Sequence, residues 1–295
     1  MKKSAASLWV WLGRIGIPAI MLCVCIATLY PLINLLAISL SGKSPVMRGA
    51  VALLPRDFTL DAYKNVLNNG YLFTAYRNTL VIVITGTALN IALTTLTAYP
   101  LSKRRLRGRT YITFFLAFTM WFSGGMIPTY LVVKNTGLLN TYWSVILPGA
   151  VGAYNTIILR NFFQTIPESL EESARIDGAG DCCILYRIIL PLCKPILATI
   201  TLWCAVGHWN SFFGPLLYFS DSDMYPLQVY LRDIVISSQL DKYGMISLSE
   251  IANMAVQSES IINATIIVSM APIVALYPFL QKYFTRGIIV GAIKG

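Results

Sequence analysis

Between two strongly apolar stretches the chain carries the polar segment Glu172-Ser173-Ala174-Arg175-Ile176-Asp177-Gly178-Ala179, followed ten residues after the glycine by Ile188-Ile189-Leu190-Pro191. Just upstream, Ser169 and Glu172 have the S-x-x-E spacing of a capping box, which predicts the start of a helix. Gly178 suits the left-handed turn that ends a helix, and a second helix is expected over 181–189. The segment 167–192 is therefore predicted to form two short helices that meet at a glycine elbow.

The composition places this polar segment in a membrane protein. Of the 295 residues, 56% are hydrophobic and 12% charged, and the mean hydropathy is +0.64. Soluble domains carry about 25% charged residues. A helix needs about 20 apolar residues to cross the hydrocarbon, and irregular backbone exposed to lipid is excluded. These rules predict an all-α polytopic membrane protein, a single transmembrane domain over residues 1–295 with six helices at about 15–40, 78–100, 111–133, 142–164, 195–219 and 260–282.

The net charge of +10 fits a topology with both termini in the cytosol. With six spans so oriented, fifteen cations and five anions are cytosolic, and eight of each lie outside. The excess is cytosolic, as the positive-inside rule requires. Loop 103–109, with five basic residues, contributes most. A nucleic-acid-binding patch is the alternative for that loop, but the loop is short and has no interleaved aromatics, so no nucleic-acid partner is expected.

Two outer segments are predicted to contain short apolar helices. One follows Thr59 within 41–77, with Leu60, Tyr63 and Leu67 on one face, and the other covers 225–236 with Pro226 at its start. Helices of this kind pack against a protein surface or lie at the membrane interface. The sequence leaves both alternatives open.

Several residues resemble sites of other chemistry but are predicted to be structural. Cys182 and Cys183 lack a nearby histidine or third cysteine for a metal site. The lone His208 is expected to be a hydrogen-bonded packing residue. The run 41–44 resembles the end of a Walker A loop, but its first glycine is replaced by Ala37. No metal, catalytic set or nucleotide site is therefore expected in this chain.

Aromatic and amide side chains in two spans are candidates for a sugar pathway. Sugars are bound by aromatic faces and by amides that meet hydroxyl groups. The candidates are Trp209, Asn210 and Phe213 in the fifth span and Tyr154 and Asn155 in the fourth. Packing between helices, with polar groups bonding across them, is the alternative.

Two other function classes fit the sequence less well. A secondary transporter driven by an ion gradient normally needs ionisable groups within the membrane, and no Asp or Glu lies in any proposed span. A membrane-bound enzyme would need paired acids, a metal cluster or a nucleophile with its base, and none is evident.

The polar segment resembles the EAA signature of the membrane subunits of bacterial ATP-binding-cassette importers. The matching positions are Glu172, Ser173, Ala174, Gly178, Ile188, Leu190 and Pro191, with Ser173 in place of the middle alanine. Residues 77–80, 209–210 and 294–295 resemble the sugar-importing branch, and 124–130 and 225–228 its complex-oligosaccharide subgroup. The resemblance covers nearly the whole chain.

That resemblance implies a type I importer permease fold in a bacterial inner membrane, with 167–192 as the loop of the coupling helix. Glu172 would pair with an arginine of a cytosolic ATPase dimer, Gly178 would form the elbow, and Ala174 and Ala179 would form a close-packed surface. ATP and Mg²⁺ would bind to that ATPase, and this chain would hold no cofactor. The other expected partners are a second, related permease, an extracytoplasmic solute-binding protein and an oligosaccharide. The full set implied for coupling is Glu171, Glu172, Ser173, Ala174, Asp177, Gly178, Ala179, Leu190 and Pro191.

Overall fold

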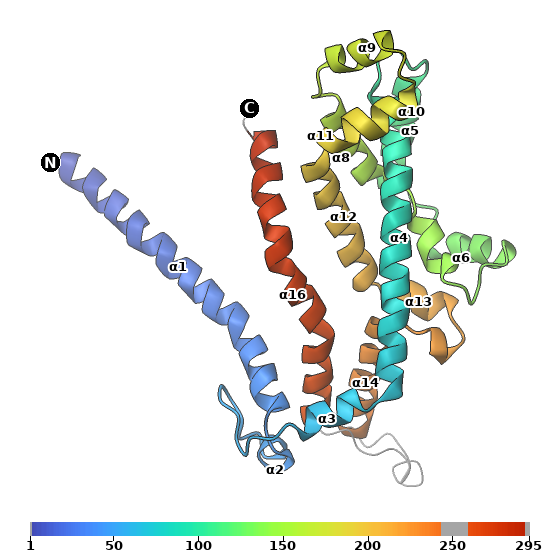
Figure 1. The fold of residues 1–295 in the computed structure, drawn as a ribbon. Coiled ribbons are helices and arrows are strands. Elements are labelled where there is room, and N and C mark those ends of the chain that lie inside the picture. The colour runs from blue at the N-terminus through green and yellow to red at the C-terminus, as the bar shows by residue number, and fades with distance from the viewer. Residues whose placement is uncertain (1, 243–258, 293–295) are drawn as a thin grey trace. The chain divides into compact units, whose positions relative to one another are not determined.

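The computed structural model describes residues 2–242 and 259–292 of the chain, and side chains within 16–236 and 259–275. Every regular element in these ranges is a helix, which confirms the predicted all-α class (Figure 1). The chain divides into two compact units, residues 1–70 with 231–271, and 71–230 with 272–295. The single domain predicted over 1–295 stays a prediction.

The first unit contains the long helix α1 (Lys2–Ser39) and the short helices α2 (Lys43–Met47) and α3 (Asp61–Leu67). The Ser39 hydroxyl bonds the Tyr63 hydroxyl at 2.8 Å, and the Ser260 hydroxyl donates to the Ser41 carbonyl at 3.3 Å. The Thr59 hydroxyl accepts from the Asp61 amide at 3.2 Å. The helix predicted after Thr59 is confirmed as α3.

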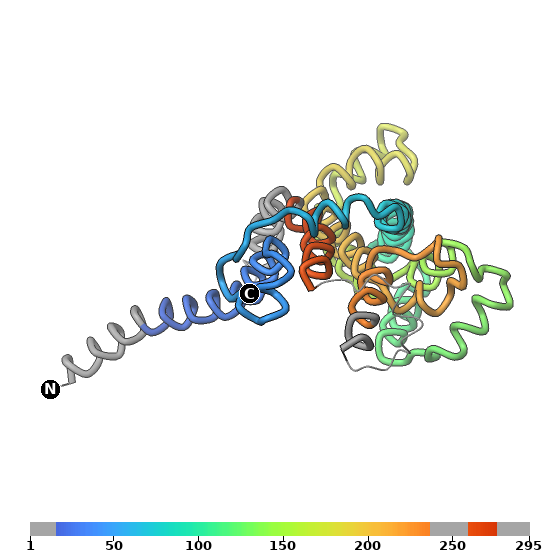
Figure 2. The backbone as a smooth tube through the Cα atoms, turned by 90° about the horizontal axis from the view of Figure 1, so that it is seen from below, coloured from blue at the N-terminus to red at the C-terminus, as the bar shows by residue number. Residues whose placement is uncertain are grey.

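The second unit is built along α4 (Gly70–Ser102). Figure 2 views this helix nearly end-on, and shows α9 and α10 on one side of it and α6 on another. The elements that follow α4 are α5 (Arg109–Trp121), α6 (Met126–Asn135), α7 (Trp143–Ile146), α8 (Ala153–Phe163), α9 (Glu168–Ile176), α10 (Asp181–Ile184), α11 (Leu190–Leu192), α12 (Lys194–Trp209) and α13 (Phe213–Tyr218). The last two helices, α14 (Leu227–Lys242) and α16 (Glu259–Ala292), run across the boundary between the units. The predicted helix that begins at Pro226 is confirmed as α14.

Two apolar clusters stabilise the second unit. One joins Tyr99 of α4 to Phe163 of α8, Ala174 of α9 and Ile200 of α12. The other joins Ile82 of α4 to Val133, Ile146, Tyr218 and Phe219. Burial of apolar side chains is the main favourable term in such packing. The first cluster lies where α4 meets α9 and α10, and it positions the polar segment.

The prediction of six continuous helical spans is not confirmed. Within the described residues, α1 and α4 are long and apolar enough to cross a membrane, and the total is four if two bent pairs each form one span. The predicted span 111–133 is broken between α5 and α6 by a bend of 113°, where Gly125 has φ +88°. The spans 142–164 and 195–219 are also interrupted, around Pro148-Gly149 and at 210–212. Glycine and proline at the first two of these breaks disfavour a continuous helix.

The second span begins earlier than predicted, at Gly70 instead of about residue 78. Asn78 is consequently inside the helix, where its amide donates to the carbonyls of Asp223 at 2.7 Å and Tyr225 at 3.1 Å. Its side-chain oxygen accepts from the Tyr142 hydroxyl at 2.8 Å. The Thr79 hydroxyl accepts from the Leu227 amide at 2.8 Å. These two residues fix the start of α14 on α4.

Candidate functional site

Helix α9 begins without the capping box that the sequence predicts. Its first residue is Glu168, and the residue before it, Pro167, makes no side-chain cap. Ser169 therefore lies in the first turn of the helix, not at its cap. Proline stiffens the entry to the helix, and Glu168 and Glu171 in the first turn interact favourably with the helix dipole.

The glycine elbow is confirmed. Gly178 has φ +84°, and its amide donates to the Arg175 carbonyl at 3.0 Å, while the Ala179 amide donates to the Ala174 carbonyl at 2.9 Å. These two bonds form a Schellman motif, which requires a left-handed residue at the position of the glycine. Ala174 and Ala179 belong to the same apolar cluster and accompany this turn. The turn sets the angle between α9 and α10.

The helix predicted over 181–189 has two parts. Helix α10 covers Asp181–Ile184, and a π-helical turn follows over Leu185–Ile189 before α11. Pro191 lacks the amide that a regular helix would use, and π turns occur where the helical ladder is locally altered. Ile184, Leu185 and Ile189 are buried in the cluster on α4, so this turn is packed against its own chain.

A buried ion pair attaches α9 to the end of α4. Lys103, the first residue after α4, contacts the Glu171 carboxylate and lies 4.6 Å above the centre of the Tyr99 ring. Arg175, one turn after Glu171, contacts the same carboxylate at 3.5 Å. Glu171 is only 5% exposed. The sequence assigned Glu171 to coupling and Lys103 only to topology, and missed their pairing because they are 68 residues apart.

A second set of charges attaches α10. Asp181 contacts Arg105 at 2.6 Å and Arg175 at 3.2 Å. The hydrogen bond from Arg105 is the largest of the effects that lower the pKa of Asp181, so this carboxylate stays ionised at neutral pH. Arg175 thus bridges α9 and α10, and loop 103–109 supplies a cation to each of the two helices.

The outer side of α9 is left uncovered by this chain. Glu172, Ser173 and Asp177 are exposed, and Ile176 is 87% exposed. Ala174 is buried and Ala179 is half-buried, and both pack in the apolar cluster of this chain. Leu190 packs against the apolar cluster, and Pro191 is exposed. Acidic and apolar groups side by side on a short, braced helix form a surface that suits binding to another protein.

The residues proposed for a sugar pathway have different environments. Trp209 is buried and packs edge-on against Tyr76, with ring centres 6.3 Å apart. Asn155 is half-buried and donates to the Cys204 sulfur at 3.5 Å. Tyr154, Asn210 and Phe213 are exposed. The sequence missed Trp203, whose ring centre is 5.9 Å from that of Tyr154 and which lies two turns before Asn210.

A neutral polar junction lies in the middle of α4. His208 shares a hydrogen bond of 2.7 Å with Asn90, as expected for a packing histidine. The Asn90 amide also donates to the carbonyls of Gly149 at 2.8 Å and Ala150 at 2.9 Å. The His208 ring lies so close to Gly86 that a β-carbon there would be 2.6 Å from Nε2. Gly86 is therefore required for the approach of α12 to α4.

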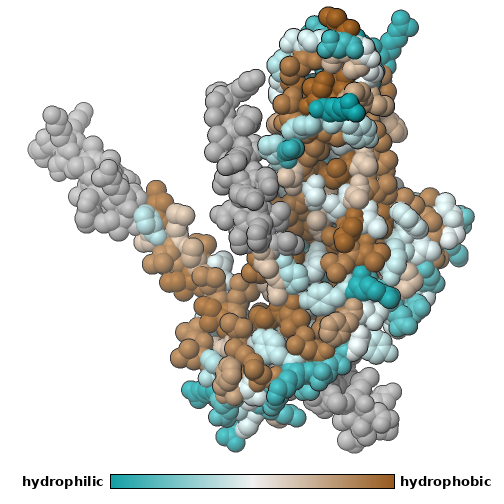
Figure 3. Space-filling view, viewed as in Figure 1, coloured by the Kyte–Doolittle hydropathy of each residue, from teal (hydrophilic) through white to brown (hydrophobic). Residues whose placement is uncertain are grey.

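The fold and this site define a helical membrane protein with a braced, charged helix pair at one end of a spanning helix. Apolar side chains cover much of the face seen in Figure 3, and polar ones are conspicuous near α9 and α10. The chain belongs to the family of binding-protein-dependent transport system inner membrane components, whose profile matches residues 100–290.

Similar proteins support this assignment. The chain is 43% identical to Protein LplC of Bacillus subtilis (strain 168), over 91% of this chain and 90% of LplC. It is 44% identical to the polygalacturonan/rhamnogalacturonan transport system permease protein YtcP of the same organism, over 90% of this chain and 92% of YtcP. A chain in the crystal structure of a bacterial ABC transporter involved in alginate import is 37% identical, with a TM-score of 0.84, and the match covers 92% of this chain and 97% of that one.

These matches confirm the predicted resemblance to importer permeases. The chain is a permease subunit of a binding-protein-dependent ABC transport system, and not an enzyme. The alternative of a transporter driven by an ion gradient finds no support among these relatives.

Proposed function

We propose that this chain is one permease subunit of an ATP-driven importer of oligosaccharides or polysaccharide fragments, with α9 as its coupling helix. The observation that carries the proposal is the combination of an exposed outer side of α9 with a buried inner side that is ion-paired to α4. A cytosolic ATPase dimer would bind the outer side, and Glu172 would pair with one of its arginines. ATP and Mg²⁺ would bind to that dimer alone.

The braced joint provides a means of coupling. Closure of the ATPase dimer would move α9, and the pairs from Lys103 to Glu171 and from Arg105 to Asp181 would carry this motion to α4. Such coupling requires rigid elements that move as bodies. The Schellman turn at Gly178 supplies that rigidity between α9 and α10.

The proposed importer contains further subunits and has a defined orientation. A second, related permease completes the pathway, and an extracytoplasmic solute-binding protein delivers the sugar to the outer segments 41–77 and 220–259. Six passes with both termini in the cytosol place loop 103–109 and residues 167–192 on the ATPase side. The positive-inside distribution of charge supports this orientation.

The proposed substrates are oligosaccharides. The names of two similar proteins refer to polygalacturonan and rhamnogalacturonan and to the acidic polysaccharide alginate. In this chain the exposed rings of Tyr154 and Phe213 and the exposed amide of Asn210 are available for stacking and hydrogen bonding with sugars. Uptake of oligogalacturonate compared with maltodextrin, in cells that express the whole importer, tests this assignment.

The role of Glu172 can be tested by co-purification of the ATPase in mild detergent. Glu172→Ala is expected to reduce the amount of ATPase recovered about tenfold, because a charge-assisted pair at an interface is lost. Glu168→Ala is the matched control, since Glu168 is also exposed on α9 and makes no cap. Equal recovery with both variants would show that Glu172 does not bind the ATPase.

The role of the elbow can be tested by uptake. Gly178→Leu is expected to abolish uptake while insertion into the membrane is unchanged, because a branched side chain at φ +84° displaces α10 relative to α9. Normal uptake by this variant would remove the elbow from the coupling mechanism.

A further inference from the structure

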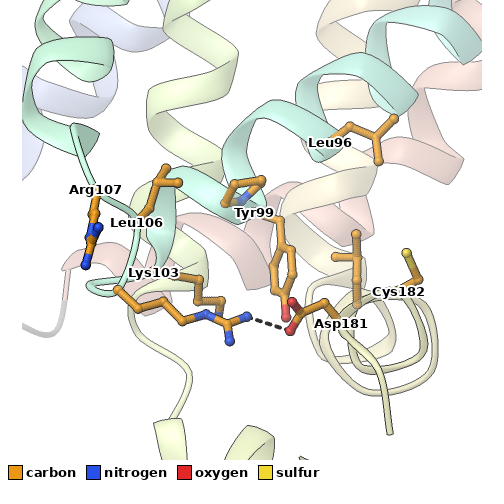
Figure 4. A pocket seen from close by; sticks show the side chains of 10 residues that line it. Leu96, Tyr99, Lys103, Leu106, Arg107, Asp181 and Cys182 are labelled. Atoms are coloured by element: carbon orange, nitrogen blue, oxygen red, sulfur yellow. Dashed lines mark hydrogen bonds and ion pairs between the residues drawn. The ribbon is translucent and has the colours of Figure 1, made fainter.

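A groove of about 520 Å³ opens beside the end of α4. Figure 4 shows the side chains that line it, which come from α4, from the loop after it, from α10 and from the π-helical turn that follows α10. One part of the lining is apolar and consists of Leu96, Pro100, Leu106 and Leu185. The groove lies next to the coupling site but does not include the outer side of α9.

The other part of the lining is cationic. Lys103, Arg105 and Arg107 line the groove, and Arg175 contacts its lining residue Asp181 at 3.2 Å. Glu171 and Asp181 are the carboxylates that these cations contact. The four cations therefore exceed the two carboxylates by two charges. Arg107 is exposed and makes no ion pair with the side chains that the structure describes, and its guanidinium is available to an anion.

A buried hydroxyl also lacks a partner in this groove. Tyr99 is only 6% exposed and lines the groove, and its hydroxyl makes no hydrogen bond to any of the described residues. Buried hydroxyl groups are normally hydrogen-bonded, because leaving one unpaired is costly. A ligand with acceptor oxygens at the head of the groove would satisfy it.

The position of the groove identifies the kind of ligand. Helix α4 has 33 residues and is about 50 Å long, whereas the hydrocarbon core is about 30 Å thick. The five basic residues of loop 103–109 directly follow this helix, and charges are costly within the hydrocarbon. The last turns of α4, which carry Leu96, Tyr99 and Pro100, therefore reach the headgroup layer. A ligand there meets apolar side chains towards the membrane and basic ones towards water.

We propose that this groove binds one anionic phospholipid, with its phosphate among Arg105, Arg107 and the Tyr99 hydroxyl and its acyl chains along Leu96 and Pro100. Basic pockets at the ends of membrane helices recognise acidic lipid headgroups in this way. A free phosphate would satisfy the same cations but would leave the apolar part of the groove uncovered. The bound lipid would brace the joint between α4 and α10.

The native Cys182 reports on the occupancy of the groove. This thiol is exposed, free and part of the lining, so a bound lipid should shield it from N-ethylmaleimide. The experiment measures alkylation of Cys182 by peptide mass spectrometry in the purified full chain in detergent. Phosphatidylglycerol is expected to slow alkylation at a concentration about tenfold lower than phosphatidylcholine with the same acyl chains.

Substitutions in the groove test where the lipid binds. Arg107→Gln is expected to raise about fivefold the phosphatidylglycerol concentration that protects Cys182, which corresponds to one lost charge contact. Tyr99→Phe should also raise this concentration. Arg104→Gln is the matched control, because Arg104 lies in the same loop, is exposed and does not line the groove. Equal shifts for Arg104→Gln and Arg107→Gln would overturn the proposal in favour of diffuse surface charge.

Three other results would also overturn it. Equal protection by phosphatidylcholine would show that no headgroup is recognised. Protection by inorganic phosphate at the same concentration would assign the groove to a free anion. Shielding of Cys182 that requires added ATPase, with no effect of lipid, would assign the groove to the protein interface.

Discussion

Two polar junctions along α4 hold other helices to it by different means. At its end, Lys103 and Arg105 bind α9 and α10 through ionised carboxylates. In its middle, Asn90 bonds His208 of α12 and two backbone carbonyls, without a carboxylate. Thirteen residues, or about 20 Å of helix, separate Asn90 from Lys103.

The difference follows from the distance of each junction to water. Charges are costly within the hydrocarbon, whereas neutral side chains can bond between helices there. The charged junction therefore marks the end of α4 that meets water, where a soluble partner can bind. The neutral junction depends on close contact at Gly86, and the charged one depends on complete pairing of its groups.

The largest expected effect comes from breaking the charged junction. Lys103→Met leaves the buried Glu171 carboxylate with only the 3.5 Å contact to Arg175, and should lower the free energy of unfolding by about 3 kcal/mol. Thermal unfolding of the purified chain in detergent measures the change. Arg104→Met is the control, since it removes the same charge from an exposed position.

A double variant sharpens this test. Lys103→Met with Glu171→Leu replaces both buried charges by apolar groups, and should recover most of the lost stability because no unpaired charge remains. If Lys103→Met is as stable as Arg104→Met, the ion pair does not hold α9 in place.

A smaller loss is expected when the neutral junction is overpacked. Gly86→Ala places a β-carbon 2.6 Å from Nε2 of His208, and should cost about 2 kcal/mol. Gly207→Ala is the matched control on α12, where a β-carbon meets nothing within 4 Å and alanine favours the helix. If Gly86→Ala and Gly207→Ala have the same unfolding temperature, the close contact of α12 with α4 is contradicted.

The smallest of these effects concerns the turn between α9 and α10. Gly178→Ala should lower the free energy of unfolding by about 1 kcal/mol, because φ +84° is unfavourable for a residue with a β-carbon. Gly180→Ala is the control, since Gly180 has φ −75° and open space around it. Thermal unfolding measures both variants. If the two substitutions change the stability equally, the left-handed turn is not needed.

The sequence predicted features that depend on neighbours in the chain. The elbow at Gly178, the helix after Thr59 and the helix that begins at Pro226 follow from local rules for glycine, capping and proline, and all three are observed. The family was identifiable from the spacing between Glu172 and Pro191. The capping box at Ser169 was not formed, because the helix begins two residues earlier, at Glu168 after Pro167.

Features that depend on distant residues could not be predicted. The partner of Glu171 is 68 residues away, and the burial of Ala174 and Trp209 depends on packing against other helices. Hydropathy also failed to reveal the bend at Gly125, because the two helices on either side of it are together apolar enough to pass as one span.

The most direct test of the account asks which side of the membrane carries α9 and α10. A membrane-impermeant maleimide should label the exposed Cys182 in inverted vesicles and leave it unlabelled in intact cells, with peptide mass spectrometry identifying the residue. That result places the charged junction where a cytosolic ATPase can reach it. Labelling of Cys182 in intact cells would contradict the account, because the proposed coupling helix would then face away from ATP.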